Sequence, residues 1–292
     1  MKIAFLHKLE NLLRKYIKTL RSGGVNRLWA DDIYKKAEGL QRCQAVIEIL
    51  ALGSSHGTFG FKAKANAFNF CASSQDLYYS WKLYEVLTNG LPHLNTVILF
   101  YSVFSPGFEL EQTGEVDRCE YYYSILGIPY KTERIQREKC RRNIHELWSH
   151  YVKKNPLVLS QEYRGNEELQ KIMKLSLEER VKAHLKHNMR NNGQTQFVER
   201  MKMFSEQAGH RLVVVVPPFR MDYVGLMGAF ETVFNELKTI DGLEVLSFYH
   251  DETFLPTDFV DMDHLNSNGA DKLSKKISLY LTGENNANDK IS

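Results

Sequence analysis

Hydrophobic residues along this 292-residue chain gather in short continuous runs, which are separated by longer amphipathic stretches. Continuous apolar runs are typical of strands covered on both faces, whereas apolar positions three and four residues apart indicate helices. The alternation predicts an α/β fold, specifically a three-layer α/β/α sandwich with a mostly parallel central sheet. The predicted strands are 45–52, 67–72, 96–102, 211–216 and 243–248.

Helices are predicted between these strands from their periodicity and from the residues at their ends. Asp76 is a suitable N-cap for the first helix, and Asn89-Gly90 favours its end. A second helix ends before Ala208-Gly209 in the same way. The predicted helices are 76–88, 194–207, 223–238 and 270–281.

Several segments lie outside this alternation. Residues 1–43 are predicted as N-terminal accessory helices, and the first of these, 9–20, is basic and amphipathic. It packs on the fold in our first interpretation and docks on a membrane surface in the alternative. A main domain, 44–282, is interrupted by a helical insertion, 107–193, which covers an active site or forms an oligomer surface. Residues 283–292 are predicted to be a frayed tail.

Composition supports a globular chain, because 43% of the residues are hydrophobic and the net charge is only +3. The apolar stretch at the amino terminus is too short for a signal peptide, and no later run approaches the length of a membrane span. We therefore expect a cytoplasmic protein, with peripheral association at the inner face of the membrane as the alternative that the basic helix suggests. The cysteines lack Cys-x-x-Cys spacing, which predicts reduced thiols; they are Cys43, Cys71, Cys119 and Cys140.

A basic segment, 131–154, lies within the predicted insertion. It is either a solvated helix face or a site for an anionic glycan or a coenzyme A phosphate. One such segment is too little for a nucleic-acid interface, and the chain has no nucleotide-binding glycine motif. His184 and His187 have helical spacing for metal ligands but no carboxylate-rich partner motif, so we predict no metal site.

The first candidate motif is Gly53-Ser54-Ser55-His56-Gly57, which follows the first predicted strand. Ligands of open α/β sheets bind at the carboxyl ends of the strands, where Ser55 would present its hydroxyl and nearby N–H groups, including those around His56, would face the substrate. The alternative is that Ser54 and Ser55 only cap a helix.

A second motif, Asp261-x-x-His264, precedes the last predicted helix. A serine is a weak nucleophile until an imidazole takes its proton, and that imidazole works best when a carboxylate fixes its tautomer. One turn of chain can place Asp261 on one nitrogen of His264 and leave the other nitrogen for a serine. Asp263 is a competing partner, and an exposed loop histidine is the alternative.

Two further loops are expected at the same edge of the sheet. After the second strand, Ser74 is a candidate oxyanion donor, while Asn69 and Gln75 would hold the loops or the substrate. After the fourth strand, Arg220 and Tyr223 either contact the substrate or belong to a rigid structural turn.

Together these motifs resemble the SGNH, or GDSL-like, hydrolase superfamily. Its members have a Gly-Asp-Ser segment after the first strand, which Gly53-Ser54-Ser55 resembles with serine in place of aspartate, and an Asp-x-x-His segment near the carboxyl end. The resemblance covers about residues 44–282 without the insertion, and implies Ser55 as nucleophile, His264 as base and Asp261 as its orienting carboxylate.

The middle motifs depart from the family pattern. Ser74 stands where the family commonly has a glycine whose amide binds the oxyanion, and Val103-Phe104-Ser105-Pro106-Gly107 replaces the usual Gly-x-Asn-Asp. The oxyanion asparagine is therefore missing, and the side chain of Ser105 or a loop amide would have to substitute for it.

The resemblance is greatest to divergent members among bacterial surface-polysaccharide enzymes, some of which move acetyl groups on sugars. It implies an O-acetyltransferase acting on a carbohydrate, namely a bacterial surface polysaccharide or its precursor, with acetyl-CoA as acyl donor and no cofactor for the triad itself. A carbohydrate O-acetylesterase is the first alternative. A noncatalytic glycan-binding or assembly protein that kept the fold is the second.

Overall fold

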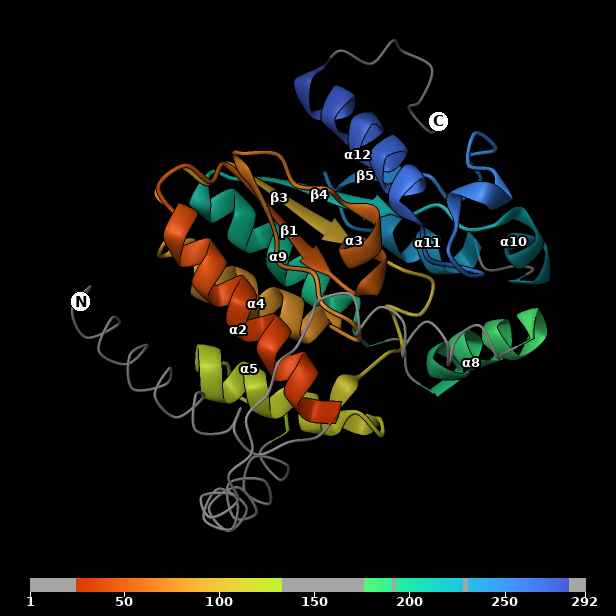
Figure 1. Ribbon diagram of the computed structural model, residues 1–292, viewed down its shortest axis with the longest axis horizontal. Helices are drawn as coiled ribbons and strands as arrows, with labels where there is room; N and C mark the ends of the chain where they lie inside the picture. Colours follow the sequence, from red (N-terminus) through yellow and green to blue (C-terminus); the bar gives the residue numbers. More distant parts are fainter. Residues whose placement is uncertain (1–24, 133–175, 191–192, 228–230, 284–292) are drawn as a thin grey trace. The chain divides into compact units, whose positions relative to one another are not determined.

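A computed structural model describes residues 25–132, 176–190, 193–227 and 231–283 (Figure 1). Five strands form one sheet in the order β2-β1-β3-β4-β5, and every neighbouring pair is parallel. The predicted α/β fold with a parallel central sheet is thereby confirmed. The strands are β1 (Ile49–Gly53), β2 (Ala67–Asn69), β3 (Thr96–Phe100), β4 (Arg211–Val216) and β5 (Glu244–Ser247).

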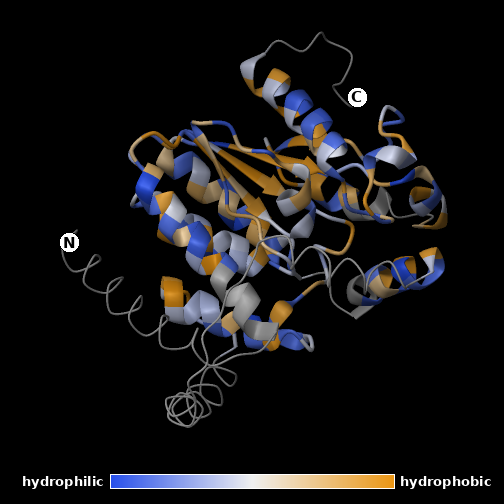
Figure 2. Cartoon of the chain, viewed as in Figure 1, coloured by the Kyte–Doolittle hydropathy of each residue, from blue (hydrophilic) through white to orange (hydrophobic). Residues whose placement is uncertain are grey.

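Helices cover both faces of this sheet. On one side α4 (Leu77–Thr88) contacts β1, α9 (Gln196–Ala208) contacts β4, and the two helices contact each other. On the other side α3 (Ser55–Gly60) contacts β1 and α12 (Ser267–Thr282), whose apolar residues share a core cluster with alternate residues of β1, β3, β4 and β5. The strands are coloured as hydrophobic in Figure 2, as expected for the middle layer of a three-layer sandwich.

The strand order places a topological switch point at the carboxyl ends of β1 and β3. The chain leaves β1 for β2 on one side and then returns to β3 on the other side. Loops diverge at such a switch point, and open α/β sheets bind their ligands there. The segments after all five strands therefore converge on the edge where the motifs were predicted.

Several predicted boundaries match the structure because their end signals are local. Asp76 caps α4 by accepting a hydrogen bond of 2.9 Å from the Tyr79 N–H, and β4 covers the predicted residues. Helix α9 ends at Gly209, whose φ of +70° suits glycine. The last helix begins three residues earlier than predicted, because the Asn266 side chain caps it.

Other boundaries differ. The first strand begins at Ile49 rather than residue 45, because residues 44–46 form a turn. Strand β2 ends at Asn69, whose side-chain oxygen accepts a hydrogen bond from the Cys71 N–H. The predicted helix 223–238 corresponds to α10 (Met221–Met227) and α11 (Glu231–Lys238), and the residues between them lie outside the described ranges.

The chain divides into two compact units, and the predicted insertion is shared between them. The described part of the smaller unit comprises α2 (Val25–Cys43), which contacts α5 (Cys119–Leu126), and two short 3-10 helices, Leu110–Gln112 and Val116–Arg118. Helix α8 (Leu177–Arg190), from the end of the predicted insertion, belongs instead to the unit that holds the sheet.

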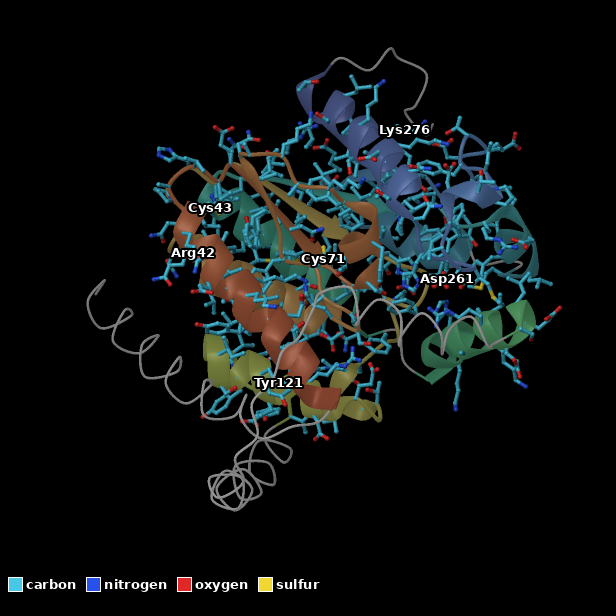
Figure 3. The ribbon with its side chains drawn as sticks, viewed as in Figure 1. Arg42, Cys43, Cys71, Tyr121, Asp261 and Lys276 are labelled. Atoms are coloured by element: carbon cyan, nitrogen blue, oxygen red, sulfur yellow. The ribbon has the colours of Figure 1, made fainter. Side chains whose placement is uncertain are left out.

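Some predictions lie outside the described residues: the basic helix 9–20, the tail from residue 284, and nearly all of the basic segment. None of the helices in the described ranges combines the length and the apolar character that crossing a bilayer requires. Cys43 (Figure 3), Cys71 and Cys119 take part in no disulfide bond within the described ranges, and Cys140 lies outside those ranges.

Candidate active site

The turn after β1 fixes the position of Ser55. A Cβ atom at Gly53, where φ is +132°, would lie 2.6 Å from the carbonyl oxygen of Phe100. At Gly57 a Cβ atom would lie 2.3 Å from Cys71 Sγ. Both positions therefore require glycine if α3 is to pack this closely on the sheet, which places the first residue of α3, Ser55, at the carboxyl end of β1.

Neither serine hydroxyl of this motif is committed to capping α3. Ser54 occupies the N-cap position but makes no side-chain cap hydrogen bond. Its Oγ lies 3.4 Å from Nδ1 of His56, while Ser55 Oγ lies 2.9 Å from Nε2 of His264. The interpretation of the two serines as simple helix caps is therefore wrong, because each hydroxyl faces an imidazole.

The loop before α12 holds His264 by both its backbone and its side chain. Asp261 accepts hydrogen bonds at Oδ1 from the backbone N–H groups of Asp263 (2.9 Å) and His264 (2.7 Å). Its Oδ2 lies 2.8 Å from Nδ1 of His264. A carboxylate that accepts from Nδ1 leaves Nε2 free to accept the Ser55 proton, so the imidazole has the tautomer that a general base needs.

Ser55, His264 and Asp261 therefore form a continuous string, although Ser55 and His264 lie 209 residues apart in the sequence. The competing carboxylate, Asp263, lies farther away, with Oδ1 3.8 Å from His264 Nδ1. The structure thus brings the three predicted residues together and assigns Asp261 to the imidazole.

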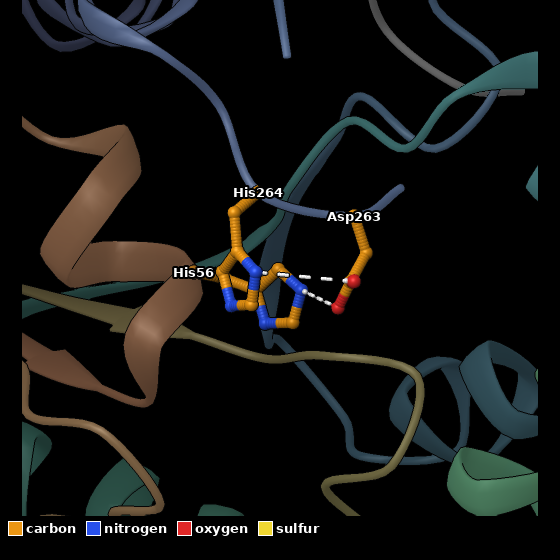
Figure 4. A group of neighbouring side chains, drawn as sticks. All are labelled: His56, Asp263 and His264. Atoms are coloured by element: carbon orange, nitrogen blue, oxygen red, sulfur yellow. Dashed lines mark hydrogen bonds and ion pairs between the residues drawn. The ribbon is translucent and has the colours of Figure 1, made fainter. Parts of the chain in front are cut away.

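A second buried network lies beside this string (Figure 4). Asp263 Oδ2 is 3.2 Å from His56 Nε2, and both Asp263 oxygens accept hydrogen bonds of 2.9 Å from Arg180, one from Nε and one from Nη2. The rings of His56 and His264 stack with centroids 4.8 Å apart and planes 18° apart. The two histidines are thus in direct contact but have different carboxylate partners.

Helix α8 contributes two side chains to this network that the sequence analysis did not predict as site residues. Arg180 binds Asp263, and His184 Nδ1 lies 2.5 Å from the hydroxyl oxygen of Tyr223. The four-residue spacing places Arg180 and His184 on one face of α8, which was the available signal. Tyr223 is itself buried, so it supports His184 from α10.

Aromatic rings surround the two histidines. Phe104 and Phe219 pack on His56 with centroid distances of 5.7 and 5.1 Å, and Phe59 meets His264 edge-on at 5.1 Å. Phe104 and Phe219 are buried, whereas Phe59 and Ser55 are partly exposed. The two histidines are therefore buried among aromatic rings, and Ser55 lies at the boundary with solvent.

Burial and charge shift the histidines in opposite directions. Burial lowers the pKa of His56 and lowers that of His184 further, so both imidazoles are neutral near pH 7. Burial also opposes protonation of His264, but the carboxylates of Asp263 and Asp261 outweigh it and raise the pKa of His264. Burial opposes ionisation of both carboxyl groups as well, yet the neighbouring positive groups hold the pKa of each below its ordinary value.

Asn69 and Gln75 are engaged in holding the loops. The Asn69 amide donates to the carbonyl oxygens of Gly57 (2.9 Å) and Phe61 (2.7 Å), which ties the end of β2 to α3. Gln75 is buried, and its Nε2 donates to Ser80 Oγ at 3.1 Å. Of the two roles predicted for them, these contacts match the support of the loops.

Ser74 is the sole non-glycine residue in the described ranges with a positive φ, at 59°. Left-handed backbone geometry favours glycine, so Ser74 keeps a conformation that a glycine would adopt with less strain. Ser105 Oγ accepts a hydrogen bond of 2.8 Å from the Ser102 N–H and so closes the turn after β3. Phe104, in the same loop, cannot replace an asparagine as a hydrogen-bond donor. Arg220 pairs with Asp222 two residues along.

His56, Asp263 and His264 are the one group of residues in the described ranges that could hold a metal ion; their ligand atoms lie within 4.8 Å of one another. Both oxygens of Asp263, however, already bind the Arg180 guanidinium, whose positive charge would repel a cation. His184 contacts Tyr223, and the side chain of His187 lies outside the described residues. We assign no metal site.

No protein-family model matches the chain, and a search of the curated proteins finds no match.

Proposed function

We propose that this protein is an SGNH-type serine enzyme that transfers an acyl group through an acyl-enzyme on Ser55. One observation carries the proposal: Ser55 Oγ lies 2.9 Å from His264 Nε2, while Asp261 lies 2.8 Å from His264 Nδ1. These contacts match the requirements of an activated serine, namely a base within hydrogen-bond reach and a group that orients the base.

In the first half-reaction, His264 Nε2 takes the Ser55 proton as Oγ attacks the carbonyl carbon of the acyl donor. Asp261 then stabilises the imidazolium, which returns its proton to the leaving group when the tetrahedral intermediate breaks down. An acceptor hydroxyl next gives its proton to His264 and attacks the acyl-enzyme. Breakdown of the second intermediate releases the ester and restores the Ser55 proton.

Two backbone amides are the proposed oxyanion donors. The Ser55 N–H belongs to the first residue of α3, where helix geometry provides no intrahelical acceptor. The second is the Ser74 N–H, in a loop that leaves β2 at the same edge of the sheet, and the positive φ of Ser74 supports this assignment. Phe104 supplies no third donor, and each donor of this kind contributes about 3 kcal/mol to the transition state.

The proposed acceptor is a hydroxyl of a carbohydrate, and the proposed activity is O-acetylation of a bacterial surface polysaccharide or its cytoplasmic precursor with acetyl-CoA as donor. The resemblance of the serine and Asp-x-x-His motifs to enzymes of that group supports this choice. Esterase activity on the same acetylated carbohydrate is the second candidate. It is favoured by the partial exposure of Ser55, because water can reach an acyl group at that position.

Acyl turnover of the purified protein tests the proposal. We expect acetyl transfer from p-nitrophenyl acetate or acetyl-CoA by the natural protein, and none above background by Ser55→Ala. Thr58→Ala is the matched control, because Thr58 is an exposed hydroxyl residue on the same helix and should keep full activity. Equal turnover by Ser55→Ala and the natural protein would refute the serine mechanism, and no turnover by either protein would favour a noncatalytic glycan-binding protein.

A second assay separates transfer from hydrolysis. The protein is incubated with [¹⁴C]acetyl-CoA and a panel of sugars and polysaccharides, and acetylated carbohydrate is measured against free acetate. A Ser55-dependent excess of acetylated carbohydrate supports the transferase. Acetate alone, at the same rate with and without acceptor, supports the esterase.

A further inference from the structure

Arg180 and Asp263 form a buried ion pair that the triad does not use. Asp263 has no exposed side-chain surface, and the Arg180 side chain is only 15% exposed. The guanidinium meets the carboxylate with two hydrogen bonds of 2.9 Å, the two-point geometry that makes such pairs specific. Asp263 comes from the Asp-x-x-His motif itself, whereas Arg180 comes from α8.

Two carboxylates lie close to one imidazole. Asp261 is bonded to Nδ1 of His264, and Asp263 Oδ1 is only 3.8 Å from the same atom. In a buried site, two uncompensated negative charges would both stabilise imidazolium at this position. A general base must release its proton easily at the working pH, so a second uncompensated carboxylate would impair His264.

We propose that Arg180 is a positioning residue of the active site: it offsets part of the charge of Asp263 and holds that carboxylate toward His56, so that of the two carboxylates only Asp261 is hydrogen-bonded to His264. The geometry supports both parts, since Asp263 Oδ2 lies 3.2 Å from His56 Nε2 and both Asp263 oxygens contact the guanidinium. In this account α8 completes the active site. The effect of Arg180 on catalysis depends on the proposed function. Its effect on the pKa of His264 is a property of the protein without substrate.

The charged and titratable groups around Asp263 and His264 come from four elements. The loop before α12 supplies the two carboxylates, α3 supplies His56, α8 supplies Arg180 and His184, and α10 supplies Tyr223. Burial keeps His56, His184 and Tyr223 neutral near pH 7, because it lowers the pKa of each imidazole and raises that of the phenol. Arg180 is therefore the one permanent positive charge among these groups.

The test is an NMR titration of His264 in protein labelled with ¹³C at histidine Cε1, with the signal assigned from His264→Gln. We expect Arg180→Gln to raise the pKa of His264 and Asp263→Asn to lower it, because the first exposes His264 to a bare carboxylate and the second leaves it beside a bare guanidinium. The double variant, which restores neutrality, should return close to the natural value. Arg211→Gln, which breaks an ion pair at an exposed edge of the sheet, is the matched control and should leave His264 unchanged.

An unchanged His264 pKa in Arg180→Gln, or a change of the same sign in both single variants, would overturn the proposal. If Arg180→Gln does not fold, Arg180→Lys and the double variant provide the comparison. Both keep the local charge balance and should titrate like the natural protein, and a shifted His264 pKa in either one would equally overturn the proposal.

A kinetic measurement tests whether Arg180 affects the reactivity of Ser55. Phosphonylation of Ser55 by a fluorophosphonate at pH 6 should be about tenfold slower in Arg180→Gln and should recover as the pH rises, because less His264 is in its basic form at pH 6. A uniform loss at every pH would mean that Arg180 only supports the fold. If the natural protein does not react at Ser55, the proposed function fails, while the NMR titration still decides the role of Arg180.

Discussion

Two serine–histidine–carboxylate strings lie side by side in this protein. Ser55, His264 and Asp261 form one, with a serine–imidazole distance of 2.9 Å; Ser54, His56 and Asp263 form the other, with a distance of 3.4 Å. The carboxylate of the first is held by backbone amides, whereas that of the second is paired with Arg180. The same three residue types thus give one imidazole with a raised pKa and one with a lowered pKa.

The two serines also differ in their exposure to solvent. Ser55 is partly exposed, while Ser54 is 2% exposed and lies beneath it. The comparison teaches that residue types and spacing do not make a nucleophile by themselves. In the proposed mechanism the serine must also be accessible to the substrate, and its hydroxyl must lie close enough to the base for a hydrogen bond.

Replacing the two serines separates the strings most strongly. Ser55→Ala should lower kcat for acyl turnover by about 10⁴- to 10⁶-fold, the loss expected when the nucleophile of a serine enzyme is removed. Ser54→Ala should cost far less, since its hydroxyl is buried and belongs to the string that we propose does not contact the substrate. Steady-state kinetics with p-nitrophenyl acetate measures kcat for both variants. Comparable losses of kcat would contradict the assignment of different roles to the two strings.

Replacing the carboxylates gives the next largest effect. Asp261→Asn should lower kcat by about 10⁴-fold, because an amide at this position favours the wrong tautomer of His264. The fold should remain, since the amide oxygen can still accept the two backbone N–H groups. Circular dichroism provides that control, and full activity in a folded variant would show that Asp261 does not orient the base.

Asp263→Asn should instead act mainly on stability. It leaves the Arg180 guanidinium buried without its counter-ion, and breaking a buried pair in this way costs about 3–5 kcal/mol. Urea unfolding measures the change, and Arg180→Gln combined with Asp263→Asn should recover part of it. A single variant as stable as the natural protein would mean that solvent reaches the pair.

Acid should weaken the fold through the buried histidines His56 and His184 before it protonates the carboxylates. Burial lowers the pKa values of His56 and His184, so below pH 6.5 these histidines bind protons in the unfolded chain but not in the folded chain. Lowering the pH therefore favours the unfolded chain. His264, whose pKa is raised, contributes stability below pH 6.5 that is lost as the pH rises through its folded value. Asp261 and Asp263 contribute stability that is lost only as the pH falls through their lowered values.

As the pH falls, His56 and His184 destabilise the folded chain, whereas His264 stabilises it. We expect the first effect to be larger, so that the free energy of unfolding falls between about pH 7.5 and pH 5. Urea titrations at both values measure it. His184→Gln should reduce the fall, and an equal or greater stability at pH 5 would contradict the assignment of neutral imidazoles to the buried network.

The smallest expected effect lies outside both strings. Ser74→Gly should stabilise the protein by about 1 kcal/mol, because a residue with a φ of 59° is strained unless it is glycine. Activity should persist, since the backbone amide that we propose as an oxyanion donor is retained. Thermal denaturation measures the gain, and a loss of stability would show that the Ser74 side chain outweighs its backbone strain.

Much of the fold was predictable because its signals are local. Continuous apolar runs located all five strands, and Asp76 and Gly209 marked helix ends correctly. The last helix begins before the first residue that its apolar periodicity indicates, because the Asn266 side chain caps it. The start of β1 was misplaced because a hydrophobic run continues through a turn, which composition alone does not distinguish from strand.

The site was predictable only in part, for a related reason. Ser55, Asp261 and His264 lie in short motifs with defined spacing, so their meeting could be inferred from the order of the strands. Arg180 lies 83 residues from Asp263 in a charged helix, where its four-residue spacing from His184 indicates a shared helix face but not the residue that it contacts. Long-range ion pairs of this kind follow from the packing of α8, which no local pattern encodes.

Mass spectrometric mapping of a fluorophosphonate adduct tests the central claim most directly. The natural protein is treated with the probe at pH 8, digested, and compared with Ser55→Ala, His264→Gln and the Thr58→Ala control. The account predicts one phosphonylated residue, Ser55, with full labelling of the control, none of Ser55→Ala and very slow labelling of His264→Gln. An adduct on Ser54, or labelling of the natural protein no faster than that of His264→Gln, would contradict it.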